Sequence, residues 1–157
     1  MERKYNIKNT ITSKFKDKMW EDQELEGKRK LIYYKEVINP TLDNQTYLYV
    51  LSSHKKKMNI AKIRTNSHEL RSETGRWFIP KTPWNDRICQ LFHSKKVEDE
   101  RHFLLDCPTL THIRSQFSTI CHTSNLLDLL SQPTYSDLGA LISLLFDHRN
   151  KILKNQI

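Results

Sequence analysis

The sequence predicts a mostly α-helical protein, a small helical domain interrupted by a loop-rich segment. Glycine and proline are scarce, with 3 and 5 copies in 157 residues, which favours helices over a β-sandwich or barrel. Apolar residues recur every three or four positions over several stretches, as expected of helices with one buried face. A hydrophobic fraction of 37% beside 28% charged residues is enough for a modest core.

The start of the chain has a clear helical pattern. Over 7–25, apolar residues recur every four positions between Lys- and Glu-rich faces, so a helix is expected there. The apolar segment 30–38 fits either a strand or a buried helix, because its periodicity does not distinguish the two. The segment ends at Asn39, which precedes a proline and is therefore disfavoured in a helix.

Two further helices are expected over 45–53 and 55–67. Both combine apolar positions at helical spacing with polar residues between them. The second also carries a run of lysines at its start, which we interpret as a solvated surface. Its expected buried residues are Met58, Ile60, Ala61 and Ile63.

The middle of the chain is less regular. Residues 70–84 lack periodicity and contain Gly75 and two prolines, so we expect an extended loop. Residues 89–96 are expected to form a turn or small hairpin. One or two helical turns are expected over 98–105, because acidic residues open that segment.

Two helices are expected to complete the fold. One begins near Pro108 and runs to about residue 120, and the last covers about 136–154. The predicted organisation is a basic helical part (1–70), a central part with the loop and the following helix (71–120), and a C-terminal helical part (121–157).

Positive charge is concentrated in one part of the chain. The formal net charge is +8 and the isoelectric point is about 9.4. Between residues 54 and 87, nine basic residues face three acidic ones, so this stretch carries +6 of the total. That balance favours a polyanionic partner, nucleic acid before an anionic membrane surface. The longest apolar run, 138–146, is too short to span a bilayer, and no membrane association is expected.

Within this basic stretch, cationic side chains alternate with aromatic ones. Cations neutralise phosphates, and aromatic rings stack on unpaired bases. The alternative is that the two tryptophans close the core while the charges face water. The candidate nucleic-acid-binding residues are Lys62, Arg64, Arg71, Arg76, Trp77, Lys81, Trp84 and Arg87.

The three cysteines are expected to be reduced or bound to metal. The charged start of the chain lacks the apolar segment of a secretory signal. An odd number of cysteines without a leader argues against a disulfide framework and for an intracellular location, cytoplasmic or nuclear. We interpret Cys121 as a core thiol at a helix end.

One Cys/His pattern has the spacing of a metal site. Cys89 is a suitable first ligand, and His102 and Cys107 form a suitable second pair. A structural zinc site needs four such donors arranged as a tetrahedron. The position three residues after Cys89, where a second cysteine is expected, is occupied by Phe92, which cannot bind zinc.

Three outcomes stay open for the fourth ligand. His93 supplies it, or water or Asp106 completes a weak three-ligand site. In the third outcome Phe92 fills the space as a core residue, and no metal binds.

The residues around this pattern resemble the C-terminal region of LINE-type (non-LTR) retrotransposon reverse transcriptase polyproteins, which carries a Cys/His knuckle. Segment 98–108 is the most specific part, because it joins an acidic turn, a His-x4-Cys pair and a proline in order. The resemblance covers most of residues 1–120. The other matching segments are 62–70, 75–77 and 87–89, with weaker matches at 33–35 and 47–48.

The resemblance implies a zinc knuckle of the form Cys-x2-Cys, spacer, His-x4-Cys. Cys89, His102 and Cys107 match its ligand positions, and Phe92 departs from it. The endonuclease and polymerase modules of the family have no counterpart in this sequence. Without an aspartate pair for two metals, a glycine-rich phosphate loop or a nucleophile motif, no enzymatic activity and no small-molecule substrate are expected.

The sequence therefore predicts a non-catalytic nucleic-acid-binding remnant of such a polyprotein, with RNA or single-stranded nucleic acid as partner. Its degenerate zinc knuckle consists of Cys89, His93, His102 and Cys107. The alternative is a structural or interaction module of helices that binds neither metal nor nucleic acid. Zinc content and salt-dependent RNA binding separate the two.

Overall fold

A computed structural model of the chain describes residues 34, 38–41, 43–92 and 95–155. The chain divides into two units, Met1–Asp43 and Asn44–Ile157. The expected helix over 7–25 and most of the segment 30–38 lie outside the described residues. In the first unit, the Asn39 side chain closes a turn: its amide donates to the Asp43 carbonyl at 2.9 Å, and its Oδ1 accepts from the Asp43 amide at 3.0 Å.

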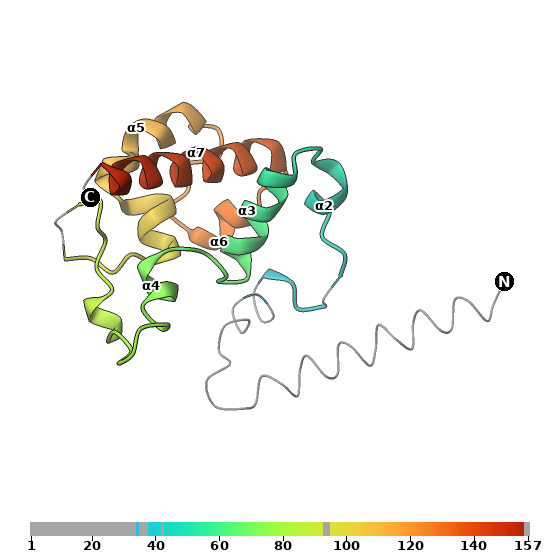
Figure 1. The fold of residues 1–157 in the computed structure, drawn as a ribbon. Helices are drawn as coiled ribbons and strands as arrows, with labels where there is room; N and C mark the ends of the chain where they lie inside the picture. Colours follow the sequence, from blue (N-terminus) through green and yellow to red (C-terminus); the bar gives the residue numbers. More distant parts are fainter. Residues whose placement is uncertain (1–33, 35–37, 42, 93–94, 156–157) are drawn as a thin grey trace, which may run out of the picture. The chain divides into compact units, whose positions relative to one another are not determined.

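The second unit is built from helices, which confirms the predicted mostly α fold (Figure 1). The only β-pairing among its described residues is an antiparallel bridge between Ile88 and Val97. Across the described part of the chain, no helix has the length and apolar character needed to span a membrane. The elements are α2 (Tyr47–Val50), α3 (His54–Arg64), α4 (Arg71–Thr74), η3 (Trp84–Asp86), η4 (His102–Asp106), η5 (Pro108–Leu110), α5 (Thr111–Arg114), η6 (Ser115–Phe117), α6 (Leu126–Leu130) and α7 (Tyr135–Lys154).

Helix α7 is the longest element, and it packs against α3 and α5 (Figure 1). Its buried residues follow the i, i+3, i+4, i+7 spacing of an amphipathic helix, as the sequence predicts. Asp137 lies in its first turn and Lys151 in its last, an arrangement that complements the helix dipole. The buried apolar residues of α7 are Leu138, Leu141, Ile142, Leu145 and Phe146.

Helix α3 has well-defined ends. The Ser53 side chain caps its start by accepting a hydrogen bond from the Lys56 amide. At its end, Asn66 adopts a left-handed conformation with φ 49°, and the Ser67 amide donates to the Lys62 carbonyl at 2.8 Å. This is a Schellman motif, which satisfies a carbonyl that the helix itself leaves unpaired.

Gly139 permits a close approach of α7 to α3. A Cβ atom at this position would lie 2.8 Å from the Cβ of Lys56, closer than two such atoms can pack. The glycine costs α7 some intrinsic helix stability, of the order of 1 kcal/mol relative to alanine. It allows the backbones of the two helices to come together.

Two details of the predicted helices differ from the structure. The expectation that Met58 is buried is wrong, because its side chain is 42% exposed. Met58 lies two positions before the buried Ile60, and residues two apart on a helix do not share a face. The single helix expected after Pro108 is divided into the short segments η5, α5 and η6.

The segment 70–84, expected to be an extended loop, contains the short helix α4. The amide of Arg71 donates to the Glu98 carboxylate at 2.9 Å, and the amide of Ser72 donates to the Glu98 carbonyl at 3.0 Å. A distant residue therefore satisfies amides that a helix start leaves unpaired. Local sequence carries no signal of such a partner.

Glu98 and Arg149 form a buried ion pair inside the unit. The guanidinium of Arg149 donates from Nε and Nη2 to the two carboxylate oxygens, at 2.7 and 2.9 Å. The Arg149 side chain is 5% exposed and the Glu98 side chain is 1% exposed. Arg149 also donates to the Glu69 carbonyl at 3.3 Å, so the pair joins α7 to the segments on either side of α4.

Replacing Glu98 with glutamine leaves the buried guanidinium without its counter-ion. We expect the free energy of unfolding to fall by about 3–5 kcal/mol, the usual cost of breaking a buried pair from one side. Asp147→Asn is the control, because the Lys55–Asp147 pair is exposed and its loss should cost less than about 1 kcal/mol. Urea denaturation of the full chain measures both variants, and equal losses would contradict this role of Glu98.

Candidate metal centre

Three of the predicted ligands come together in the structure. The side chains of Cys89, His102 and Cys107 are all buried, and their ligand atoms lie within 4.8 Å of one another. A tetrahedral zinc ion holds two thiolate sulfurs about 3.8 Å apart, since each Zn–S bond is about 2.3 Å. The three donors are therefore close enough to hold a metal ion after small side-chain adjustments.

Cys89 is positioned by a small hairpin. Its amide donates to the Lys96 carbonyl at 2.8 Å, and the amide of Glu98 donates to the Arg87 carbonyl at 2.9 Å. The bridge between Ile88 and Val97 lies between these two hydrogen bonds. The predicted turn or hairpin over 89–96 is therefore present, and it directs Cys89 into the interior.

His102 and Cys107 are brought together by the π-helix η4. The Cys107 amide donates to the His102 carbonyl at 2.6 Å, a bond across five residues that closes one π-helical turn. Asp99 caps this turn, because its Oδ1 accepts from the His102 amide at 2.7 Å. The ring of Phe103 packs 4.8 Å from that of Phe146, which anchors η4 on α7.

Two side-chain hydrogen bonds attach the segment after Cys107 to its surroundings. The Thr109 hydroxyl donates to the Leu91 carbonyl at 3.0 Å and connects this segment to the hairpin. Arg114 donates to the Cys107 carbonyl at 2.5 Å. Burial lowers the pKa of Arg114, and the negative charge of the nearby thiolates partly offsets that effect.

The two thiols are inequivalent. A hydrogen bond with Cys107, together with burial, raises the pKa of Cys89 to about 12, although the nearby His102 acts in the opposite direction. The same hydrogen bond from Cys89 lowers the pKa of Cys107 to about 6, against the effect of burial. Cys107 is therefore the thiolate and accepts a hydrogen bond from the Cys89 thiol, which keeps its proton. Thiolate is the form that binds metals.

His102 contributes a second indication of a ligand at this position. Its Nε2 atom is buried and has no hydrogen-bond partner among the described residues. An unsatisfied buried nitrogen costs about 1–3 kcal/mol, so native structures normally pair such atoms with protein, water or an ion. A metal ion held with the two cysteines would satisfy it.

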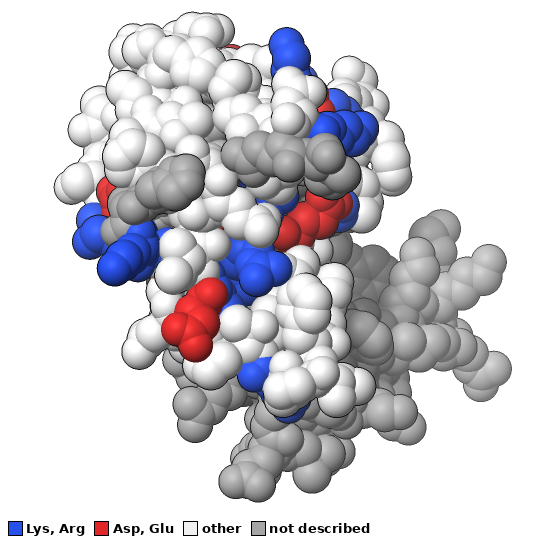
Figure 2. All heavy atoms as spheres, turned by 60° about the vertical axis from the view of Figure 1, so that its left-hand side comes forward, with Lys and Arg blue, Asp and Glu red and all other residues white. Residues whose placement is uncertain are grey.

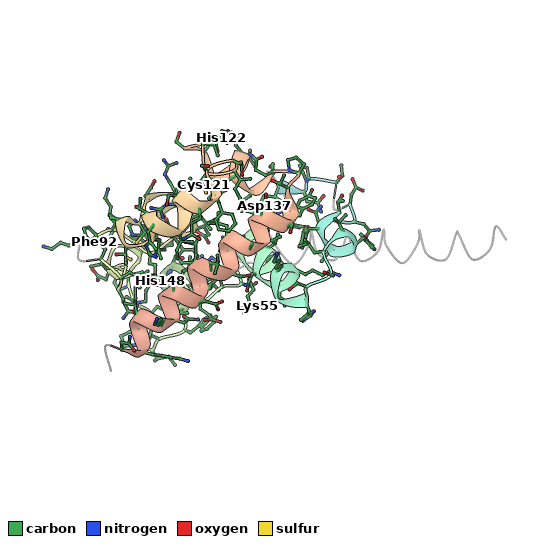
Figure 3. All side chains as sticks on the ribbon, turned by 90° about the horizontal axis from the view of Figure 1, so that it is seen from above. Lys55, Phe92, Cys121, His122, Asp137 and His148 are labelled. Atoms are coloured by element: carbon green, nitrogen blue, oxygen red, sulfur yellow. The ribbon has the colours of Figure 1, made fainter. Side chains whose placement is uncertain are left out.

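The residues considered for the fourth ligand are differently placed. Phe92 is 42% exposed and lies at the periphery of the molecule, so it does not fill the space between the donors (Figure 3). Asp106 is half exposed and pairs with Arg101 at 3.3 Å, outside the Cys/His group. His93 lies outside the described residues. Cys121 lies away from Phe92 and is also outside the group (Figure 3).

Two of the candidate nucleic-acid-binding residues are buried and bonded within the protein. Arg64 donates to Gln45 Oε1 at 2.7 Å and to the Leu130 carbonyl. Arg87 donates to the carbonyls of Ser72 and Thr82, at 2.6 and 3.0 Å. Their exposures are 4% and 8%, so little of either side chain can reach a partner.

The other candidates lie nearer the surface. Trp77 and Trp84 are 65% and 48% exposed, and Lys81 is exposed as well. Lys62, Arg71 and Arg76 are half-buried: Lys62 pairs with Glu69, Arg76 pairs with Glu73, and the Arg71 guanidinium lies over the Phe78 ring. Figure 2 shows basic side chains in separate groups on one face, interspersed with a few acidic ones.

A cleft of about 530 Å³ borders the metal centre. Its walls come from η3, the hairpin and η4, and His102 contributes to both the cleft and the Cys/His group. Trp84 and His102 were predicted from the sequence as site residues, whereas Asp99, which accepts from the His102 amide, was not. An aspartate followed by the acidic Glu100 is a helix-start signal that could have identified it. The remaining lining residues are Lys96, Val97, Arg101, Asp106 and Pro108.

Comparison of the chain with protein-family models, curated proteins and solved structures gives no match.

Replacing Asp99 with alanine removes the acceptor that fixes the His102 amide. We expect the free energy of unfolding to fall by about 1 kcal/mol, as for other N-cap residues. Cys107 should also be alkylated faster, because the turn that buries it loosens. Asn125→Ala, which removes the cap of α6, is the matched control. Peptide mapping by mass spectrometry measures alkylation, and an equal acceleration in both variants would rule out a local effect of Asp99.

Proposed function

We propose that this protein is a non-catalytic nucleic-acid-binding module whose knuckle holds a structural zinc ion. The observation that carries this proposal is the buried group of Cys89, His102 and Cys107. Basic and aromatic side chains at the surface between residues 71 and 84 supply the contacts to nucleic acid. We further propose that the module descends from the C-terminal region of a LINE-type reverse transcriptase polyprotein, on the basis of the resemblance of segment 98–108.

Zinc suits this donor set better than other common metal ions. Thiolate and imidazole ligands favour zinc, whereas magnesium and calcium prefer oxygen ligands. The acidic residues nearest to the site already have other roles, since Asp99 caps η4 and Asp106 pairs with Arg101. In this proposal, zinc closes the loop between the hairpin and η4 and contributes to folding.

The fourth ligand in this proposal is His93, with water as the substitute. His93 follows Phe92 directly in the sequence, four positions after Cys89. Phe92 is 42% exposed, so its ring does not take the place of a fourth ligand beside the three donors. A site with two thiolates and one or two imidazoles resembles structural zinc sites in its donor chemistry.

Nucleic acid is the proposed partner because charge and aromatic surface occur together. The stretch 54–87 carries +6 of the net charge of +8. Trp77 and Trp84 expose large parts of their rings in the same stretch. Cations neutralise the phosphate backbone, and exposed rings stack on unpaired bases, so this combination favours RNA or single-stranded DNA.

Zinc content tests the metal centre. We expect the wild-type chain to retain close to one zinc per molecule after dialysis, and His102→Ala and Cys107→Ser to lose it. Phe92→Cys should bind zinc more tightly, because it adds a thiolate at the position where a knuckle has its second cysteine.

Cys121→Ser is the control, since this thiol lies outside the group and its loss should leave zinc content unchanged. Metal analysis and the absorption of a cobalt-substituted sample report on the ligands. If neither the wild type nor Phe92→Cys holds near-stoichiometric zinc, the knuckle proposal is wrong.

RNA binding tests the partner. We expect binding of single-stranded RNA at 50 mM salt to weaken steeply as salt increases, because phosphate contacts release counterions. Trp77→Ala should cost about 1–3 kcal/mol if the ring stacks on a base, and Arg76→Ala should reduce the salt dependence.

Lys55→Ala is the control, since it removes one positive charge from a side chain that is paired with Asp147. Fluorescence anisotropy with a labelled oligonucleotide gives the affinities. Negligible binding at 50 mM salt would exclude the nucleic-acid proposal and favour a helical interaction module.

A further inference from the structure

The cleft beside the metal centre has the size of a ligand site. Its volume of about 530 Å³ falls within the range of roughly 300–1,000 Å³ that is usual for small-molecule sites. Trp84 of η3 lines it together with residues of the hairpin and of η4. Two of the elements that line the cleft, the hairpin and η4, also position the three metal ligands.

Trp84 is held in a fixed position with part of its ring exposed. The guanidinium of Arg87 lies 5.6 Å from the ring centroid. Hydrogen bonds to the carbonyls of Ser72 and Thr82 hold this guanidinium in turn. The Arg87 side chain can take this position because residue 75 is a glycine: a Cβ there would lie 2.7 Å from the Arg87 side chain. The ring is thus supported from inside the protein, while 48% of the residue remains exposed.

The charges in the cleft favour an uncharged ligand group with polar edges. Lys96 and Arg101 contribute two positive charges, and Asp99 and Asp106 contribute two negative ones. Because Arg101 pairs with Asp106 at 3.3 Å, the lining offers no net attraction for a phosphate. Carboxylate, ammonium and guanidinium groups can instead hydrogen-bond to the donors and acceptors at the edge of a nucleobase.

We propose that this cleft is a subsite for one unpaired nucleobase, stacked on Trp84, with its edge facing Arg101 and Asp106. The inference rests on the proposed nucleic-acid binding and adds to it the place and the kind of ligand. Phosphates on either side of the base would face the basic residues that precede Trp84, among them Arg76 and Lys81. A duplex cannot use the cleft, because its bases are already paired and stacked, so the ligand is single-stranded.

The fluorescence of Trp84 tests the proposal directly. In a Trp20→Phe, Trp77→Phe variant of the full chain, Trp84 is the remaining tryptophan. We expect a single-stranded RNA octamer to quench its emission, and the same octamer annealed to its complement to leave it unchanged. Trp84→Leu in the wild-type background should weaken octamer binding roughly 5- to 150-fold, the factor that corresponds to about 1–3 kcal/mol of stacking.

Trp84→Phe is the conservative control, because it keeps a stacking ring and should retain most of the affinity. Circular dichroism before and after each substitution shows whether the helices are intact. If Trp84→Leu is misfolded, Arg101→Gln provides a second test, and it should weaken octamer binding without changing the metal content.

Failure of the subsite proposal and failure of the nucleic-acid proposal give different results in these experiments. If the octamer binds, but Trp84 emission does not change and both Trp84→Leu and Arg101→Gln bind as tightly as wild type, the base subsite is wrong and the nucleic-acid proposal stands. If no form of the chain binds the octamer at 50 mM salt, the nucleic-acid proposal is wrong, and the subsite proposal is excluded with it.

Discussion

The buried pair between Glu98 and Arg149 is the contact on which the arrangement of the unit depends. A buried carboxylate is costly unless its oxygens are fully bonded. Glu98 meets this requirement with both guanidinium bonds and the Arg71 amide, and its carbonyl accepts from Ser72. One residue thereby connects the long helix α7, the start of α4 and the end of the hairpin. Since Asp99 and η4 follow Glu98 directly, the same contact also sets the position from which the metal ligands are presented.

The candidate metal centre is built from short elements that would not be stable alone. A two-residue β-bridge and one π-helical turn bury little apolar surface, and isolated turns of helix are marginal in water. Packing of Phe103 on Phe146 and the bond between Thr109 and Leu91 supply tertiary support. A metal ion would add a further cross-link between the hairpin and η4. The proposed zinc site and the fold around it are therefore interdependent.

Sequence periodicity was sufficient to predict the long helices and insufficient to predict the polar contacts. Helices α3 and α7 follow from apolar spacing, and the grouping of Cys89, His102 and Cys107 follows from ligand spacing. The burial of Arg64 and Arg87 does not follow from either, because a positive charge in a sequence carries no information about which distant carbonyl will accept from it. For the same reason α4 was not predicted, because its first amides are satisfied by the distant residue Glu98. The π-helical turn has no known local signal, since its hydrogen bond differs from that of an α-helix by one residue.

The buried arginines show that some basic residues of this protein bond within the fold and do not face solvent. Arg64, Arg87 and Arg149 each donate to at least one backbone carbonyl of another segment, and Arg64 and Arg149 also donate to a distant side chain, so all three act as internal cross-links. A planar fork with five N–H donors can serve two acceptors at fixed angles, whereas a lysine ammonium cannot reproduce that geometry. Exchange of arginine for lysine at these positions would preserve the isoelectric point and disconnect the segments. Two of the nine basic residues between 54 and 87 therefore serve the fold, and fewer positive side chains of this stretch can reach a polyanionic partner than the composition indicates.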